Sequence, residues 1–323
     1  MKMKTILIAA AAATLMTQGA LAATYTLRLG HVLAPTDPLS IAADGMKAAI
    51  EERSNGEIEV QIFTNSQLGD TQDMLDQAQA GANIGTFAEA SRFGPQVPAF
   101  NVLVAPYAFR NVNELAKFVE GPTFAKWNDE LIEKTGLTIL SFNWYQGARN
   151  FLTKMPVSVP ADLEGVRIRT IGQPLWISTI QAMGAVPTPM AWAEVYPSIQ
   201  TGAIDGAEAQ PAAVWGAKLY EVVSNITVTE HIYLMSGLVV SDAWLKSLPE
   251  DLQTIVREEA VRWGNEALKA NVEGEDKIFA DIAATGVSID RIDTTPFQEA
   301  VKPVYEELGL TELIAEVRAE LGM

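Results

Sequence analysis

The segments YTLRLG at residues 25–30 and EIEVQIF at residues 57–63 indicate the fold class, together with the sequence around them. Both alternate apolar with polar side chains, as strands do when one face is buried. A third, shorter strand is predicted at residues 84–88, and helices are predicted at residues 38–54 and 69–80. The order strand, helix, strand, helix, strand predicts parallel strands joined by right-handed crossovers, and therefore an α/β fold.

The same alternation of strands and helices resumes in the middle of the chain. Strands are predicted at residues 137–142, 166–171, 203–208 and 236–241, and helices at residues 123–134, 174–183 and 193–200. A chain of 323 residues is long enough for two domains, and no Pro-, Gly- or Ser-rich linker divides it. Two domains without a linker indicate that the chain crosses between lobes more than once.

An unusually long helix is predicted from Pro249 to Ala284. Its apolar side chains keep helical spacing on one face, and acidic residues directly after Pro249 favour a helix start there. About 35 residues at ~1.5 Å each give roughly 50 Å, which exceeds the length of one lobe. The segment either breaks at Gly264 or Gly274 or runs along both lobes as a strut, and we predict the strut.

The first residues have the pattern of a cleavable signal peptide. A basic start, MKMK, precedes an apolar run from Ile6 to Met16, and Ala20-Leu21-Ala22 matches a small-x-small cleavage site. A membrane anchor is the alternative, but residues 17–19 interrupt the run before it reaches the ~20 apolar residues that a span needs. We predict cleavage after Ala22, export to the periplasm and a mature protein without a membrane anchor.

Composition and charge exclude several classes of protein. The apolar content of 48% is that of a globular chain, and the absence of cysteine excludes disulfide scaffolds and cysteine nucleophiles. Forty acidic against 23 basic residues give a charge of −17, or −19 once Lys2 and Lys4 leave with the signal peptide, so we predict no nucleic-acid partner. His31 and His231 are the only histidines and lie far apart, so we predict neither a metal site nor a cofactor.

Three arginines are candidates for binding an anion. Arg167 and Arg169 lie two residues apart on a predicted strand and share a face, and Arg149 precedes them in the chain. One interpretation is that each forms an internal salt bridge with a carboxylate. The other is that one guanidinium stays free in a cleft, where its planar fork suits bidentate binding of a ligand carboxylate. The residues alone leave both interpretations open.

Aromatic and acidic candidates divide in the same way. Trp192 precedes a predicted helix at an expected cleft edge, although tryptophans are ordinarily core or lobe-interface residues. His31 closes the first strand, where a histidine is more often a solvated or capping residue. Asp205 and Glu208 are close enough in sequence to form a carboxylate pair for acid–base catalysis, but no nucleophile or histidine is near them. We therefore do not favour catalysis at this pair.

The run RIRTIGQPLWISTIQAMGAVPTPMAWAEVYPSIQTGAIDGAE, residues 167–208, resembles the signature of the solute-binding proteins of TRAP transporters, the DctP-type family. Supporting stretches follow in family order: NSQLGD (65–70), FAEASRF (87–93), the YQGARNF region, LYEV (219–222) and SLPEDLQ (247–253). The resemblance implies a two-lobed periplasmic-binding-protein fold, class II-like, with the ligand cleft between the lobes and the long helix spanning both. It places lobe I at about 23–146 and 235–274, and lobe II at about 147–234 and 275–323.

The resemblance also implies ligand-binding residues. In the family, the arginine at the position of Arg169 forms the salt bridge to the substrate carboxylate, and Arg149, Glu89 and Trp192 match positions in the same cleft. Gln210 stands where many members offer an asparagine amide to the ligand. The full set of predicted substrate-binding residues is Arg169, Arg149, Glu89, Trp192, Gln210, His31 and Trp215.

Departures from the family pattern bear on the ligand. FAEASRF resembles the branch that binds sialic acid, yet Val32, Gly172 and Ala209 stand where that branch has polar side chains. We therefore expect a smaller or more apolar anion than a polyhydroxylated sugar acid, either a carboxylate or an organosulfonate.

The resemblance implies a periplasmic protein that captures this small organic anion. It would deliver the anion to the small and large integral membrane subunits of a TRAP transporter, which an ion gradient drives. Two alternatives stay open: a ligand sensor that presents the anion to a receptor kinase, and, less favoured, an exported enzyme.

Overall fold

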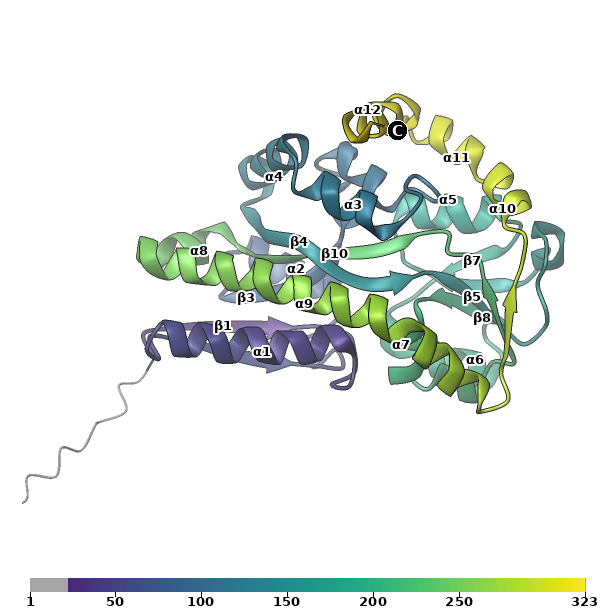
Figure 1. Ribbon diagram of the computed structural model, residues 1–323, viewed down its shortest axis with the longest axis horizontal. Helices are drawn as coiled ribbons and strands as arrows, with labels where there is room; N and C mark the ends of the chain where they lie inside the picture. The colour runs from purple at the N-terminus through teal and green to yellow at the C-terminus, as the bar shows by residue number, and fades with distance from the viewer. Residues whose placement is uncertain (1–22, 323) are drawn as a thin grey trace, which may run out of the picture.

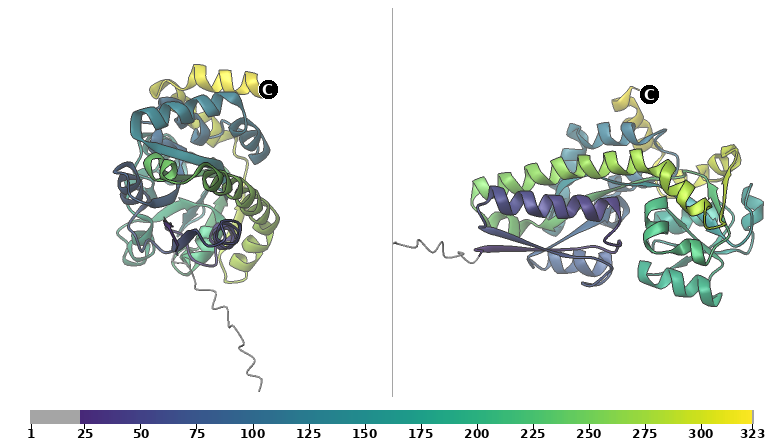
Figure 2. Two further views of the ribbon diagram at one scale, coloured as in Figure 1. Left: turned by 90° about the vertical axis from the view of Figure 1, so that its left-hand side faces the viewer. Right: turned by 60° about the horizontal axis from the view of Figure 1, so that its bottom comes forward.

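The structure is a computed structural model that describes residues 23–322, so the predicted signal peptide lies outside the described residues. It is an α/β protein with two β-sheets arranged end to end, and the long helix α9 (Glu250–Ala283) runs along both of them (Figure 1). Figure 2 shows the two sheets as separate lobes with α9 lying across them. Within the described residues, no helix is both long and apolar enough to cross a bilayer.

The first sheet has the strand order β2-β1-β3-β10-β4. Its strands are β1 (Tyr25–Gly30), β2 (Ile58–Phe63), β3 (Ile84–Glu89), β4 (Leu137–Ala148) and β10 (Tyr233–Ser241). β1 pairs in parallel with both β2 and β3, as the alternation of strands and helices predicts, whereas β10 runs antiparallel to β3 and β4. The helices that pack against these strands are α1 (Pro38–Arg53), α2 (Thr71–Gln79), α3 (Val112–Val119), α4 (Pro122–Thr135) and α8 (Asp242–Ser247).

The second sheet has the strand order β11-β9-β5-β8-β6-β7. Its strands are β5 (Asn150–Thr153), β6 (Arg167–Thr170), β7 (Val186–Pro189), β8 (Gly206–Ala209), β9 (Asn225–Val228) and β11 (Ser288–Arg291). Between them the chain forms α5 (Pro174–Ala182), α6 (Val195–Thr201) and α7 (Pro211–Gly216). β6 lies in parallel between β7 and β8, so the segment with Arg167 and Arg169 is an inner strand of this sheet.

Two strands are longer than their sequence pattern predicts. The alternation predicts strands at 137–142 and 236–241, whereas β4 continues to Ala148 and β10 begins at Tyr233. The added residues pair with each other, with Ala148 opposite Tyr233 and Gly147 opposite Leu234. The pattern ends early because both faces of these segments are covered, so polar side chains no longer mark a solvent face.

Two crossing segments connect the sheets and are hydrogen-bonded to each other. The N–H of Arg149 donates to the carbonyl of Ile232 at 2.9 Å, and the N–H of His231 donates to the carbonyl of Arg149 at 3.2 Å. We call residues 148–150 and 229–233 the hinge ribbon. Any change in the angle between the sheets must be absorbed near this narrow connection, since strands on either side are held in their own ladders.

The strut interpretation of the long helix is confirmed, because α9 is uninterrupted over 34 residues. It contacts α1 and β4 beside the first sheet and α7 and β11 beside the second. Gly264 does not break the helix; a Cβ at this position would lie 2.0 Å from Oδ1 of Asn143. The glycine therefore serves the close approach of α9 to β4, where the amide of Asn143 donates to the carbonyl of Val261 at 2.8 Å.

The C-terminal helices return from the second sheet to the first. They are α10 (Thr295–Ala300), α11 (Lys302–Glu307) and α12 (Thr311–Leu321). α11 contacts α5, but α12 packs against α3 and the 3₁₀ segment Pro98–Val104, and Arg318 donates to the carbonyls of Tyr107 and Ala108 at 3.3 Å each. The prediction that residues up to 323 belong to lobe II is therefore wrong for α12, which adds a further crossing that apolar spacing alone could not assign to a lobe.

Candidate ligand-binding site

The structure separates the three candidate arginines by their partners. Arg167, at the start of β6, pairs with Asp205 at 2.7 Å and also donates to the carbonyls of Gly202 and Ala203. The side chains of Arg167 and Asp205 are 44% and 41% exposed. This pair is a solvated salt bridge at the sheet surface, so neither Arg167 nor Asp205 is available to a ligand.

Arg149 is buried and fully engaged with protein groups. Its Nε donates to a carboxylate oxygen of Glu208, one terminal nitrogen donates to the carbonyl of Glu208 at 2.6 Å, and the other donates to Oε1 of Gln210 at 2.8 Å. Burial alone would raise the pKa of Glu208, but the charge of Arg149 and the neighbouring His231 outweigh it and hold that pKa at about 2. Glu208 is therefore the internal partner of an arginine and not half of a catalytic pair.

Arg169 is the exception among the three. It is 5% exposed, and its Nε and one terminal nitrogen both donate to the carbonyl of Met190, at 3.1 and 3.0 Å. Its guanidinium lies 5.3 Å from the ring centre of Trp192, and no carboxylate within residues 23–322 pairs with it. Burial lowers the pKa of Arg169 to about 10, so the group stays cationic at neutral pH. A buried cation without a counter-ion is costly unless an anion joins it.

Arg169 faces a cavity of about 70 Å³ between the two sheets, which we call the central cavity. From the first sheet and its loops it is lined by Val32, Leu33, Asp70, Thr71, Glu89, Arg92, Gln146, Leu234 and Ser236. From the other side it is lined by Arg149, Arg169, Ile171, Trp192, Gln210 and Ala213. A group bound here would therefore touch both sheets at once.

Two further cavities flank the central cavity. The Met190 cavity, of about 280 Å³, shares Asp70, Arg92, Arg169 and Ile171 with the central cavity. On the opposite side, the Tyr196 cavity, of about 170 Å³, shares Val32, Leu33, Trp192 and Ala213 with it. Arg169 and Trp192 thus stand at the two boundaries of a row of three cavities.

Glu89 places a second charge in the central cavity. It ends β3 and caps the following turn, where one oxygen accepts from the N–H of Ser91 at 2.8 Å and from its hydroxyl at 2.6 Å. The other oxygen lies 3.2 Å from Nε of Arg92 without hydrogen-bond alignment. The same Ser91 hydroxyl accepts from Nε1 of Trp176 in α5 at 2.9 Å, so a buried contact joins the two sides next to the cavity.

Five of the seven predicted site residues line the central cavity: Arg169, Arg149, Glu89, Trp192 and Gln210. His31 does not line it; it is 2% exposed, contacts the ring of Phe87, and burial lowers its pKa to about 4. Trp215 does not line it either; it is 37% exposed and stacks on Tyr220 with ring centres 4.9 Å apart. The structure therefore does not bring these two predicted residues to the cavity, since the His31 side chain is buried beside Phe87 and the Trp215 side chain is partly exposed on α7.

Five polar side chains of the same cavity were not predicted from the sequence: Asp70, Thr71, Arg92, Gln146 and Ser236. Gln146 donates to the hydroxyl of Ser236 at 2.7 Å and accepts from Gln210 at 3.0 Å, so β4, β10 and the start of α7 meet in one polar network. Asp70 and Arg92 lie within NSQLGD and FAEASRF, so the family motifs already marked their neighbourhood. The expectation of a smaller or more apolar anion rested on Val32, Gly172 and Ala209, but polar side chains reach this cavity from other positions.

Comparisons with known proteins agree with this geometry. Residues 29–311 match the family model described as bacterial extracellular solute-binding protein, family 7. The chain is 32% identical over 310 residues to the 2,3-diketo-L-gulonate-binding periplasmic protein YiaO of Escherichia coli strain K12, covering 92% of this chain and 93% of that protein.

Two solved structures of TRAP periplasmic solute-binding proteins differ in an informative way. The one from Escherichia fergusonii, an apo open structure, is 44% identical with a TM-score of 0.80, covering 91% of this chain and 99% of that chain. The one from Ochrobacterium anthropi, with bound L-fuconate, is only 29% identical but has a TM-score of 0.89, covering 93% and 100%. The overall TM-score is thus higher for the ligand-bound relative than for the open one, although its sequence identity is lower.

Proposed function

The chain belongs to family 7 of the bacterial extracellular solute-binding proteins, the solute-binding proteins of TRAP transporters, and we propose that it captures a hydroxylated organic carboxylate in the central cavity. The observation that carries the proposal is Arg169, a buried guanidinium that has main-chain and aromatic partners but no carboxylate. Its planar fork matches a carboxylate, and a dry site strengthens such a pair relative to water. In this proposal the ligand supplies the missing anion.

The ligand class follows from the groups around that arginine. Asp70, Glu89 and Gln146 line the same cavity as Arg169, and their carboxylate oxygens and amide can exchange hydrogen bonds with the hydroxyl groups of a sugar acid. The relatives named above bind 2,3-diketo-L-gulonate and L-fuconate, both sugar acids. A sugar acid can also extend from the central cavity into the Met190 cavity, since Arg169 lines both. A short dicarboxylate such as succinate, or a sulfonate such as taurine, has no hydroxyl groups with which to hydrogen-bond these side chains.

Closure of the two lobes on the ligand follows from the same geometry. Glu89 and Asp70 come from the first sheet's side, and Arg169 and Gln210 from the second, so a small ligand reaches all four only when the lobes are close. Closure also buries the arginine–carboxylate pair away from water. A ligand that contacts both sides binds the closed state better and therefore shifts the population toward it.

The finer parts of the function rest on family membership. We propose that the mature protein works in the periplasm and hands its ligand, chemically unchanged, to the small and large membrane subunits of a TRAP transporter. The carboxylates that could have suggested catalysis, Asp205 and Glu208, are both paired with arginines. A sensory role beside a receptor kinase would use the same cavity, and reconstituted uptake with the membrane subunits distinguishes the two roles.

The test is a thermal-shift screen followed by calorimetry. The screen would contain L-fuconate and D-glucuronate as sugar acids, succinate as a short dicarboxylate and taurine as a sulfonate. A tight ligand raises stability by RT ln(1 + [L]/Kd), so the sugar acids should give the largest shifts. For the best ligand, Arg169→Ala should weaken binding by about 30- to 5,000-fold, corresponding to ~2–5 kcal/mol.

Arg167→Ala is the matched control, because it removes an arginine two residues away whose partner is Asp205. It should bind the ligand as the wild type does. Equal affinities of wild type and Arg169→Ala would overturn the assignment of the anion site. A larger shift with succinate or taurine than with any sugar acid would leave the site in place but contradict the ligand class.

A further inference from the structure

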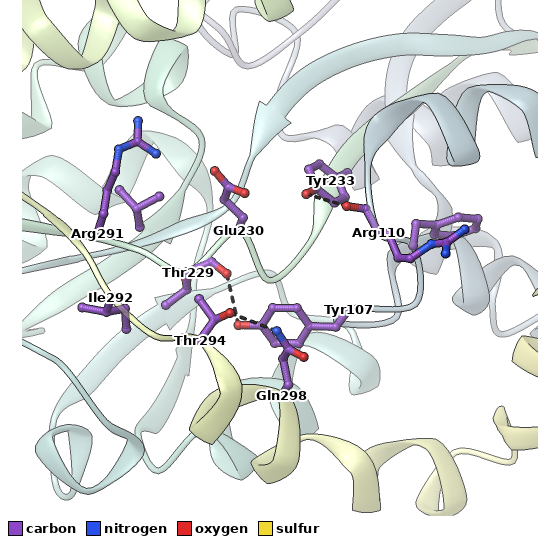
Figure 3. Close-up of a pocket in the computed structure, with 11 residues that line it drawn as sticks. Tyr107, Arg110, Thr229, Glu230, Tyr233, Arg291, Ile292, Thr294 and Gln298 are labelled. Atoms are coloured by element: carbon purple, nitrogen blue, oxygen red, sulfur yellow. Dashed lines mark hydrogen bonds between the residues drawn. The ribbon is translucent and has the colours of Figure 1, made fainter. Parts of the chain in front are cut away.

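The largest cavity described, of about 430 Å³, lies on the other side of the hinge ribbon from the central cavity, and we call it the rear cavity (Figure 3). Leu234 and Ser236 of β10 line the central cavity, whereas Tyr233 and Glu230 line the rear one. The two cavities are therefore lined by neighbouring residues of one stretch of chain, 228–236. The volume lies within the range of small-molecule sites, ~300–1,000 Å³.

The rear cavity contains a carboxylate and a guanidinium that do not satisfy each other. Within residues 23–322, the Glu230 carboxylate has no hydrogen-bond or salt-bridge partner. Arg291 has one ion pair, with Asp276 at 3.7 Å, and the Asp276 side chain is 98% exposed. By contrast, Arg110 at the other end of the cavity is neutralised by Glu114 at 2.6 Å. Glu230 and Arg291 are thus the charges left for an occupant.

Strand pairing brings these two charges to the same wall. β9 and β11 are parallel neighbours with Val228 opposite Arg291, and Glu230 follows Val228 by two residues. Glu230 lies just beyond the end of β9, so the two side chains start from neighbouring stretches of chain. Figure 3 shows Glu230 and Arg291 among the side chains that line the cavity. A ligand that carries both an ammonium and a carboxylate group can meet each of them with the opposite charge.

The backbone around the rear cavity is held in an unfavourable conformation. Tyr107 and Glu230 have φ angles of 57° and 46°, in the left-handed region that side chains other than glycine rarely adopt. Tyr107 is fixed there because its N–H donates to the carbonyl of His231 at 2.8 Å and its hydroxyl donates to the carbonyl of Thr229 at 3.1 Å. Such strain gathers at ligand clamps and switch regions, and here both strained residues line one cavity.

We propose that the rear cavity is a second binding site, which takes an α-amino acid zwitterion with an apolar side chain. The ammonium group pairs with Glu230, the carboxylate pairs with Arg291, and the side chain packs between the rings of Tyr107, Phe109 and Tyr233. An ammonium beside an aromatic ring gains cation–π attraction in addition to the ion pair. A simple anion would meet Glu230 with like charge, and a simple amine would meet Arg291 in the same way.

The test is calorimetric titration with L-phenylalanine and two analogues that each lack one charge, 3-phenylpropionate and 2-phenylethylamine. The titrations use the full mature chain carrying Arg169→Ala, so that a carboxylate cannot report binding in the central cavity. L-phenylalanine should bind with a 1:1 stoichiometry and at least about tenfold more tightly than either analogue. Because Arg169→Ala disables the central cavity, a lack of L-phenylalanine binding would not bear on the proposed binding of a sugar acid there. A lack of sugar-acid binding by the wild type would in turn leave the L-phenylalanine titration interpretable.

Glu230→Gln and Arg291→Gln, each added to the same background, should weaken L-phenylalanine binding by about tenfold or more, with melting curves that verify folding. Lys134→Gln, in α4 and outside every cavity described, is the control and should not change the affinity. Absence of L-phenylalanine binding up to ~10 mM would overturn the proposal. Equally tight binding of 3-phenylpropionate would also overturn it, because Glu230 would then not be selecting an ammonium group.

Discussion

Two buried arginines line the central cavity, and their surroundings are opposite. Around Arg149, the carboxylate of Glu208 and the amide of Gln210 satisfy the guanidinium within the protein. Arg169 instead donates to the carbonyl of Met190 and lies against the face of Trp192, and no carboxylate of residues 23–322 forms a salt bridge with it. The comparison teaches that a buried cation in a cavity is suited to bind a ligand anion when the protein supplies no carboxylate partner for it. Arg149 is paired within the protein, whereas Arg169 is the cation that we propose binds the ligand's carboxylate.

The largest expected effect is a loss of stability on replacing Arg149, whose hydrogen bonds are all made within the protein. Arg149→Ala leaves the buried Glu208 carboxylate without its main partner, and breaking a buried pair from one side costs about 3–5 kcal/mol. Urea unfolding of the ligand-free protein measures this loss. Arg167→Ala breaks an exposed pair and should cost less than about 1 kcal/mol. Equal losses in the two variants would show that Arg149 and Glu208 do not form a structural pair.

Removing the charge of Arg169 should change the free energy of unfolding in the opposite direction. Arg169→Met removes a buried, uncompensated charge, so the unfolding free energy of the ligand-free variant should not fall and should rise by about 1 kcal/mol. Ligand binding should be lost. Arg169→Lys should retain part of the affinity, since an ammonium supplies the charge but not the bidentate fork. A destabilised Arg169→Met would mean that the arginine has a structural role after all.

The two regions should also respond at opposite ends of the pH scale. The pKa of Glu208 is lowered to about 2 from its ordinary value of 4.5, so its stabilisation is present above pH 4.5 and is lost as the pH falls toward 2. The pKa of Arg169 is lowered to about 10, so the cation that binds the ligand is lost above that pH. Unfolding measured from pH 2 to 7, and calorimetry from pH 6 to 11, should place the two losses in these separate windows.

Trp192 should show a smaller effect, confined to binding. Its ring lies 5.3 Å from the guanidinium of Arg169 and lines both the central and the Tyr196 cavities. Trp192→Ala should therefore weaken ligand binding by about tenfold, while the ligand-free protein loses less than the ~3–5 kcal/mol of a core tryptophan. Trp215→Ala, outside these cavities, should leave affinity unchanged. A loss of ~3–5 kcal/mol in Trp192→Ala would show instead that Trp192 is a core packing residue.

The smallest expected signal is a change in overall dimensions. Small-angle scattering should give a smaller radius of gyration with saturating ligand than without it, because the ligand contacts both sides of the central cavity. Arg169→Ala at the same ligand concentration should keep the larger value. An unchanged curve for wild-type protein at proven saturation would show that the lobes do not move on binding.

The first sheet was largely predictable because its signals are local. Alternation at 25–30 and 57–63, with helices between, indicates parallel pairing of β1 with its neighbours, and the structure has this pairing. The long helix was predictable for the same reason, since its apolar spacing holds across Gly264. The extension of β4 and β10 could not be predicted from local pattern, because the added residues are mostly buried and polar side chains do not mark a solvent face there.

Which of the three arginines have a carboxylate partner could not be predicted from their spacing in the sequence. Arg149 and Glu208 are 59 residues apart and meet only because β5 and β8 are neighbours in the second sheet. Gln146 and Ser236 reach the cavity through the pairing of β4 with β10, which is equally non-local. The family motifs selected Arg169 correctly as a cavity residue, whereas the inclusion of His31 and Trp215 failed because a motif does not state which way a side chain points.

The unbroken course of α9 has a mechanical consequence. Its two halves are anchored on different sheets, to α1 and β4 at one end and to α7 and β11 at the other. A rod of about 50 Å held in this way cannot follow a change in lobe angle without bending, and bending lengthens its hydrogen bonds on one side. If the lobes close on a ligand as proposed, the helix would therefore store part of the binding energy as bending strain. That strain would be relieved when the lobes reopen, which would favour release of the ligand over indefinite retention.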